Sequence, residues 1–275
     1  MINRNKLRID IGTSNTAVNS AYWFDKISNL TVCGVEPNPI NISELRATPE
    51  ELPLDYKLSV GEGIVSNKGE KICTLKEKNN QFILIEGAID CGEEREQNFY
   101  CTNEINRGCS SLYEPVNIPY GIETENIIKV NTFSLDSLVE KLNWQNEMCI
   151  DYLKIDTQGN DLNVIKSCQK YIHLFAFIQL EFFTRGEYAN IDEEKTELAQ
   201  FNKTKLLMEE RNFACVMRDH SDALFVNMGL IEFISYTKID ESNHSYQSSN
   251  WFEKWCLRNP ELYKRLTNGQ EVPFG

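Results

Sequence analysis

The chain has 275 residues, of which 41% are hydrophobic and 25% are charged, with 28 Lys and Arg against 41 Asp and Glu. This composition can bury a sizeable core and excludes an intrinsically disordered chain, and the length suits one large α/β domain. The formal charge of -13 repels phosphate backbones and anionic lipid headgroups, so nucleic acid is not an expected partner.

Neither a secretory signal nor a membrane segment is expected. The first residues reach a charged, strand-like segment without an apolar stretch, and no run of about 18 apolar residues occurs. We therefore expect a cytoplasmic protein without membrane insertion. The nine cysteines form no C-x-x-C pair, and the three histidines are not spaced to complete a cysteine pair. We expect reduced thiols and no metal site.

The N-terminal part predicts a β-α-β unit. Residues 7–11 and 30–35 are strand-like runs that end at polar residues, and residues 16–29 leave room for a helix between them. Parallel strands joined in this way need a right-handed crossover. A further short helix is expected over residues 41–46, after Pro39.

Residues 55–130 predict hairpins inserted into this α/β frame. Short strand-like runs at 56–60, 71–75 and 82–85 are separated by Gly and Asn residues, which favour turns. We expect the frame to return with a strand over residues 129–133.

A helix is expected over residues 134–142. Ser134 is suited to cap its N-terminus, and an apolar stripe at helical spacing should face the sheet. The stripe consists of Leu135, Leu138, Val139 and Leu142.

The alternation of strands and helices continues in the next part of the chain. Residues 152–155 form a strand-like run that ends at Asp156, and a helix is expected over residues 162–168. Residues 174–180 are almost continuously apolar, which is typical of a central strand covered on both faces.

A long helical pattern ends at Glu210, and residues 213–217 and 223–226 then form two strand-like runs that can pair as an antiparallel hairpin. The sequence therefore predicts an α/β fold with a mostly parallel sheet and an antiparallel strand near one edge. We expect this domain to span residues 1–240. Residues 241–275 are expected to form a polar extension, helical and docked on the same domain.

Three acidic residues stand at the ends of predicted strands. Asp10, Glu36 and Asp156 each come directly after an apolar run, and open α/β sheets bind ligands at the carboxyl ends of their strands. Glu36 follows Asp10 at a spacing close to the interval of about 20 residues at which an acid reaches ribose hydroxyls in dinucleotide sites. The alternative is that Glu36 caps the turn at Pro37.

The loop after the first strand contains Gly12, Thr13 and Ser14 but no G-x-G-x-x-G pattern, which argues against a dinucleotide cofactor. One glycine followed by small hydroxyl residues is better suited to the carboxylate of a methionine group than to a pyrophosphate.

These motifs resemble those of the FkbM family of methyltransferases. The resemblance extends over roughly residues 7–227 and is carried, in the order of the family, by residues 10–14 (DIGTS), 34–39 (GVEPNP), 86–90 (EGAID), 109–112 (CSSL), 130–138 (VNTFSLDSL), 151–161 (DYLKIDTQGND) and 222–226 (DALFV).

The resemblance implies a Rossmann-like class I methyltransferase fold with seven strands, and an S-adenosylmethionine-dependent O-methyltransferase. The acceptor would be a sugar hydroxyl of a glycan or glycolipid precursor, or a small metabolite. The oligomeric state stays open. The residues expected to bind the cofactor S-adenosyl-L-methionine are Asp10, Gly12, Thr13, Ser14, Glu36, Asn38, Ala88, Ile89 and Asp156.

Two residues are candidates for the chemistry. Asp156 can hold the ammonium of the cofactor or orient the acceptor hydroxyl, and Glu181 can act as a general base if burial raises its pKa. Their alternatives are a helix cap for Asp156 and a backbone contact for Glu181.

The chain departs from the family pattern K-I-D-x-E-G-x-E at two positions, where Gln158 and Asp161 replace glutamates. Gln158 cannot act as a base, and Asp161 reaches less far than a glutamate.

A second resemblance connects residues 9–16 with the first phosphate loop of actin-like ATPases and sugar kinases, in which Asp10, Gly12 and Thr13 would hold phosphate. That fold needs a second phosphate hairpin and a Gly-Gly adenosine motif. Residues 156–159 are a poor version of the former, and the latter is missing, so ATP binding is the secondary hypothesis.

Overall fold

The structure is a computed structural model of the chain. It describes residues 6–15, 17–46, 63–65, 71–74, 79–116, 121–144, 150–182, 188, 197–218, 221–230, 240–241, 260–261 and 264.

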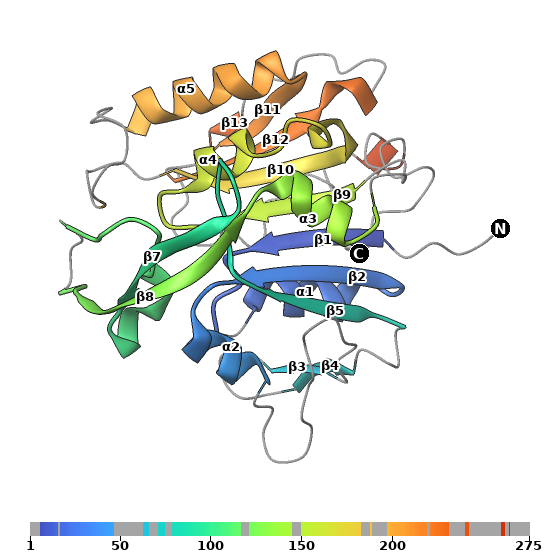
Figure 1. The fold of residues 1–275 in the computed structure, drawn as a ribbon. Helices are drawn as coiled ribbons and strands as arrows, with labels where there is room; N and C mark the ends of the chain where they lie inside the picture. The colour runs from blue at the N-terminus through green and yellow to red at the C-terminus, as the bar shows by residue number, and fades with distance from the viewer. Residues whose placement is uncertain are drawn as a thin grey trace.

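An eight-stranded sheet of the described residues forms the centre of the molecule (Figure 1). In spatial order its strands are β13 (Asp240–Glu241), β11 (Phe213–Arg218), β12 (Asp222–Asn227), β10 (Phe175–Glu181), β9 (Ile150–Ile155), β1 (Lys6–Ile11), β2 (Leu30–Glu36) and β5 (Gln81–Glu86).

Five neighbouring strands, from β10 to β5, run parallel, and β12 lies antiparallel between β10 and β11. The expected mostly parallel α/β sheet is confirmed, and it is consistent with a Rossmann-like fold. Seven strands were expected, and β13 is an eighth, because two residues beyond the predicted hairpin pair with β11.

Helices pack on both faces of this sheet. They are α1 (Val18–Lys26), α2 (Pro39–Arg46), α3 (Leu135–Lys141), α4 (Asp161–Lys166) and α5 (Glu197–Glu210), with short 3-10 turns at Glu104–Cys109 (η2), Ile172–Leu174 (η3) and Met228–Leu230 (η4).

The side chains of the strands alternate between two cores, one on each face. Helices α1 and α2 contribute Phe24 and Ile42 to the first core, and helices α3, α4 and α5 contribute Leu138, Ile165 and Met208 to the second. The helices of the two groups lie on opposite faces of the sheet (Figure 1). This two-sided cover explains why β9 is buried along its whole length.

Strand β1 carries buried charges toward one of these faces. Arg8 is fully buried between the rings of Trp23 and Tyr152, and its Nε and Nη2 atoms each lie 2.8 Å from Oδ2 of Asp151. A buried guanidinium needs such a partner. The ion pair therefore ties β1 to β9, the two strands between which the order of the sheet reverses.

A second sheet projects from the edge at which the parallel strands end (Figure 1). It consists of β6 (Ala88–Ile89), β8 (Thr124–Phe133) and β7 (Arg95–Thr102), and β7 and β8 form a long antiparallel hairpin. Strands β3 (Gly63–Val65) and β4 (Lys71–Thr74) form a smaller hairpin. The expectation that hairpins are inserted into the α/β frame is thus confirmed, although not for every predicted strand.

Two of the strand assignments in this region were wrong. Residues 82–85 belong to β5 of the central sheet, where Phe82 faces Val32 of β2, and residues 129–133 belong to β8 of the inserted hairpin. A short apolar run has the same pattern in both settings, so only the distant pairing partners decide between them. The predicted run 56–60 lies outside the described residues.

The predicted helix boundaries are close to those observed. Ser134 caps α3 as expected, because its Oγ accepts the N–H of Ser137 at 3.0 Å. The hairpin of β11 and β12 is also confirmed. Most of the expected extension 241–275 lies outside the described residues.

Of the helices in the described part of the chain, none is both long and apolar enough to cross a membrane.

Candidate functional site

A pocket lies where the order of the parallel strands reverses. The chain first adds β2 and β5 on one side of β1, and then β9 and β10 on the other side. Ligands of open α/β sheets bind at such a switch point, outside the carboxyl ends of the strands. The loops after β1, β2, β5 and β9 surround an empty space of about 670 Å³, which includes part of the open solvent, and this size suits a small molecule.

Gly12 brings two of these loops into contact. Its φ is +81°, a conformation that favours glycine, and a Cβ at this position would lie 1.8 Å from the carbonyl oxygen of Asp156. The N–H of Asp156 donates to the carbonyl of Ile11 at 3.0 Å. The close approach therefore places Asp156 directly beside the end of β1.

Glu36 is the last residue of β2, and only 3% of its surface is exposed. Its Oε2 accepts the backbone N–H of Ser14 at 2.9 Å, and its Oε1 accepts the N–H of Asn38 at 2.9 Å and the amide of Asn41 at 3.2 Å. Burial raises the pKa of Glu36 to about 7, against these hydrogen bonds. Glu36 thus both caps the turn at Pro37 and lines the pocket.

Asp156 lines the pocket from the other side, and 34% of its side chain is exposed. Nζ of Lys154 lies 3.1 Å from its Oδ2, and Nε2 of Gln158 donates to its Oδ1 at 2.7 Å. Burial opposes ionisation, but the Lys154 ammonium and the hydrogen bonds from Glu181 and Gln158 hold the pKa of Asp156 below its usual range. Asp156 therefore presents a negative charge to the pocket.

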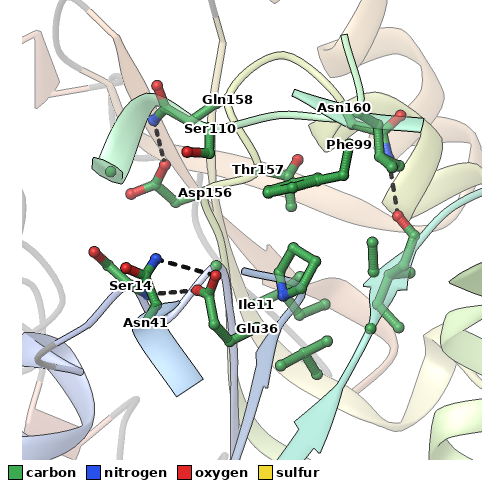
Figure 2. Close-up of a pocket in the computed structure, with 18 of the residues that line it drawn as sticks. Ile11, Ser14, Glu36, Asn41, Phe99, Ser110, Asp156, Thr157, Gln158 and Asn160 are labelled. Atoms are coloured by element: carbon green, nitrogen blue, oxygen red, sulfur yellow. Dashed lines mark hydrogen bonds between the residues drawn. The ribbon is translucent and has the colours of Figure 1, made fainter. Parts of the chain in front are cut away.

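Figure 2 shows the pocket between these groups, with Glu36, Ser14 and Asn41 on one side and Asp156 and Gln158 on the other. The two carboxylates reach one cavity because their strands, β2 and β9, flank β1 in the sheet.

Glu181 ends β10 and does not line the pocket. It accepts a hydrogen bond from Nε2 of Gln158 at 3.2 Å and is hydrogen-bonded to Asp156. Burial, followed by the negative charge of Asp156, raises the pKa of Glu181 well above its usual value. Glu181 lies behind Asp156, so its role as a general base stays a prediction.

Three of the expected cofactor-binding residues do not line the pocket. Asp10 lies inside β1 and is fully buried, where it accepts the Ser20 hydroxyl at 2.7 Å and faces Nζ of Lys154 at 3.7 Å. The prediction that Asp10 shares the pocket with Gly12 and Glu36 is wrong. Asp10 is not the residue after β1 but lies inside it, and its side chain points toward α1.

Thr13 and Asn38 are also buried beside the pocket. Thr13 packs against Gly34: a Cβ atom added to Gly34 would lie only 2.7 Å from Cγ2 of Thr13. Oδ1 of Asn38 accepts the N–H of Ile40 at 3.0 Å, at the start of α2. Thr13 and Asn38 therefore support the loops around the pocket, while the adjacent residues Gly12, Ser14 and Pro37 line it.

Ala88 and Ile89 lie in the wall of the pocket, as expected, next to Gly87. The carbonyl of Ile89 accepts the side-chain amide of Asn160 at 2.8 Å, and Phe99 of β7 adds its ring to the same wall (Figure 2). This wall supplies an apolar surface to the pocket.

Several lining residues were missed by the sequence reasoning. Phe99 and Arg107 come from the inserted hairpin and η2, whose position over the pocket follows from tertiary pairing. Asn41 and Asn160 follow the strand-end acids Glu36 and Asp156 by a few residues. Their short polar side chains next to those acids were the available signal.

Within the described residues, no three His, Cys, Asp or Glu side chains are grouped so that they could hold a metal ion.

The family model of the methyltransferase FkbM domain matches residues 10–215 of the chain. Comparisons with curated proteins and with solved structures found no match. Nothing in the site or in these comparisons supports ATP binding. The matched region includes strands β2, β5, β9 and β10 of the sheet, the pocket lining and both pocket carboxylates. The chain belongs to the FkbM methyltransferase family and is a methyltransferase.

Proposed function

We propose that this methyltransferase binds S-adenosylmethionine in the pocket at the switch point and transfers its methyl group to an oxygen atom. The acceptor would be a sugar hydroxyl of a glycan or glycolipid precursor, or a small metabolite. The observation that carries the proposal is the pair of carboxylates, Glu36 and Asp156, that line opposite sides of one cavity.

The surroundings of Glu36 fit a ribose. A carboxylate has about four sites that accept hydrogen bonds, and three partners within the protein are Ser14, Asn38 and Asn41. One site is left for a ligand hydroxyl. Oδ1 of Asn41 is also buried and accepts no hydrogen bond from the described residues, so a donor on the ligand would satisfy a second acceptor.

The loop after β1 fits the methionine end of the cofactor less directly than the sequence suggested. The N–H groups of Gly12 and Thr13 already donate to the carbonyl of Val35, and the N–H of Ser14 donates to Glu36. These backbone donors are therefore occupied. The carboxylate of a methionine group would instead meet the Ser14 side chain and Arg107.

Arg107 has the only cationic side chain among the described residues that line the pocket. Its Nη1 pairs with Glu44, and its Nε donates to the carbonyl of Glu104 at 3.2 Å. These contacts leave the guanidinium with further donors. We assign Arg107 to the cofactor carboxylate and Asp156 to the ammonium beside it.

The bound cofactor would supply an activated methyl group. Methyl transfer requires the acceptor oxygen to be aligned with that group and to lose its proton. Asp156 is ionised and partly exposed, so it can accept this proton as well as hold an ammonium. The negative charge of Asp156, with the formal charge of -13, favours a neutral acceptor such as a sugar over an anionic one.

The proposal is tested by incubating the protein with S-adenosylmethionine that carries a labelled methyl group and an extract of cell-surface glycans. We expect label in a base-stable ether linkage on a sugar, and a rate of labelling that is lower by a factor of about 10²–10⁴ with Asp156→Asn. Label in carboxyl esters or on nitrogen would contradict O-methylation of a hydroxyl.

A further inference from the structure

We propose that Gln158 is a positioning residue that joins the carboxyl groups of Asp156 and Glu181 into one hydrogen-bonded unit with a single proton between them. Asp156 is then the member that presents the negative charge to the pocket, and Glu181 is the member that carries the proton. The consequence for the reaction rests on the proposed function, whereas the proton arrangement itself does not.

One nitrogen atom connects the two acids. Nε2 of Gln158 donates to Oδ1 of Asp156 at 2.7 Å and to Oε2 of Glu181 at 3.2 Å. A primary amide has two N–H groups, so each acid receives one. The opposite orientation of the amide would turn its oxygen toward two carboxyl groups. Only the observed orientation gives both acids a donor.

The amide is held from its other end as well. Oε1 of Gln158 lies 3.0 Å from the hydroxyl of Tyr188, and that hydroxyl also lies 2.9 Å from the carbonyl of Cys109. The backbone carbonyl of Gln158 accepts the hydroxyl of Ser111 at 2.7 Å. The surroundings therefore fix both the side chain and the backbone of Gln158.

The backbone conformation of Gln158 supports a dedicated role. Its φ is +56°, a left-handed value that is sterically unfavourable for a non-glycine residue. Gly159, the next residue, also has a positive φ, of +102°. Two successive residues in this region direct the Gln158 side chain back toward the strand end, and strain of this kind persists where the surroundings over-determine it.

The charges around the pair assign the proton to Glu181. Asp156 faces the Lys154 ammonium, which also pairs with Asp10 on the neighbouring strand β1. The Lys154 ammonium also acts on Glu181, but burial comes first among the causes that raise the pKa of Glu181, and the negative charges of Asp156, Asp222 and Asp161 add to it.

Asp222 lies opposite Glu181 in the pairing of β12 with β10, and Asp161 starts α4. Burial and these charges raise the pKa of Glu181, and Lys154 with the shared hydrogen bond lowers that of Asp156. A protonated Glu181 can donate to Asp156 but cannot take a proton from an acceptor. The arrangement therefore favours Asp156 over Glu181 as the base.

Infrared difference spectroscopy of the full chain without ligand tests the arrangement directly, because a protonated carboxyl group has its own carbonyl stretch. The spectrum of the wild type at pH 7 minus that of Glu181→Gln should contain this band. In Gln158→Met, which keeps the length of the side chain and removes both donors, the band should move to another frequency. Gln97→Met serves as a matched control, since Gln97 also donates to an acid and lies outside the pocket lining; the distance from its Nε2 to Oδ2 of Asp90 is 2.6 Å.

The infrared titration of the Asp156 carboxylate between pH 2 and 6, taken as wild type minus Asp156→Asn, gives the second measurement. Loss of the Gln158 donor should move this titration to higher pH by about one unit, since a hydrogen bond to the charged form of an acid stabilises that form. Gln97→Met should leave the titration in place. Circular dichroism establishes that each variant is folded.

The proposal is overturned if the spectrum of the wild type minus that of Glu181→Gln contains no protonated-carboxyl band, or if folded Gln158→Met changes neither this band nor the titration of Asp156. These results differ from a failure of the proposed function. If S-adenosylhomocysteine does not bind to the wild type at all, the cofactor assignment fails and the infrared result still decides the role of Gln158.

Discussion

Asp156 combines partial exposure with an ionised carboxylate at the end of β9. We expect Asp156→Asn to lower turnover on the identified acceptor by a factor of about 10²–10⁴, the usual effect of losing an acid–base group. The fold should be retained, because asparagine can keep the contact with Lys154 through its oxygen. Initial-rate measurements with labelled cofactor check this, and near-wild-type turnover would remove Asp156 from the chemistry.

Arg107 is expected to bind the carboxylate end of the cofactor. Its replacement by methionine, which preserves much of the side-chain volume, should weaken binding of S-adenosylhomocysteine about tenfold or more, since a hydrogen bond to a charged group contributes about 1.5–3 kcal/mol. Arg95→Met is the matched control, because Arg95 on β7 is 59% exposed and lies outside the pocket lining. Equal losses in both variants would indicate a general effect of charge.

The pocket residues that could be predicted from the sequence are acids or glycines at the end of a strand. Gly12, Glu36 and Asp156 fall into this class. The sequence misplaced Asp10 because β1 continues for one more residue, to Ile11. Asp10 therefore lies inside the strand, and its side chain points to the face of the sheet that α1 covers. Arg107 was beyond reach, because its place over the pocket depends on η2 and the hairpin before it.

At the scale of single elements, α3 shows how local signals set a boundary. The Ser134 cap and the buried Leu135, Leu138 and Val139 follow the predicted pattern. We expect Ser134→Ala to lower the free energy of unfolding by about 1 kcal/mol, the usual effect of removing an N-cap. Urea unfolding measures this, and cofactor affinity should stay unchanged. A loss of affinity without a loss of stability would contradict a purely local role.

Strands were predicted less well than helices for a physical reason. A helix is determined by contacts three and four residues apart, whereas a strand is determined by partners far along the chain. Strand β5 lies beside β2 across 50 residues, with Thr31 opposite Gln81. Residues 82–85 carry no local mark of that pairing, and the same holds for residues 129–133 in β8.

At the scale of the whole molecule, buried acids make stability depend on pH. Burial raises the pKa of Glu36 and of Asp161 to about 7, above the values of the unfolded chain. The folded state therefore binds more protons, so this stability is fully present below the unfolded pKa and is lost as the pH rises through about 7. Asp156, whose pKa is lowered, acts in the opposite direction.

We therefore expect the free energy of unfolding to be higher at pH 5.5 than at pH 8. For Glu36 a shift of this size corresponds to a contribution on the order of 3 kcal/mol, so Glu36→Gln should reduce the pH dependence. The exposed variant Glu93→Gln is the control. Urea unfolding at several pH values provides the comparison, and stability that increases toward pH 8 would contradict the account.

The central claim is that the switch-point pocket binds the cofactor through Glu36, and calorimetric titration with S-adenosylhomocysteine tests it most directly. We expect one site per chain and an affinity that rises between pH 6 and 8 as Glu36 ionises. Folded Glu36→Gln should bind more weakly by about 1–3 kcal/mol, with a flatter pH dependence. Absence of binding to the wild type, or an unchanged affinity in Glu36→Gln, would contradict the claim.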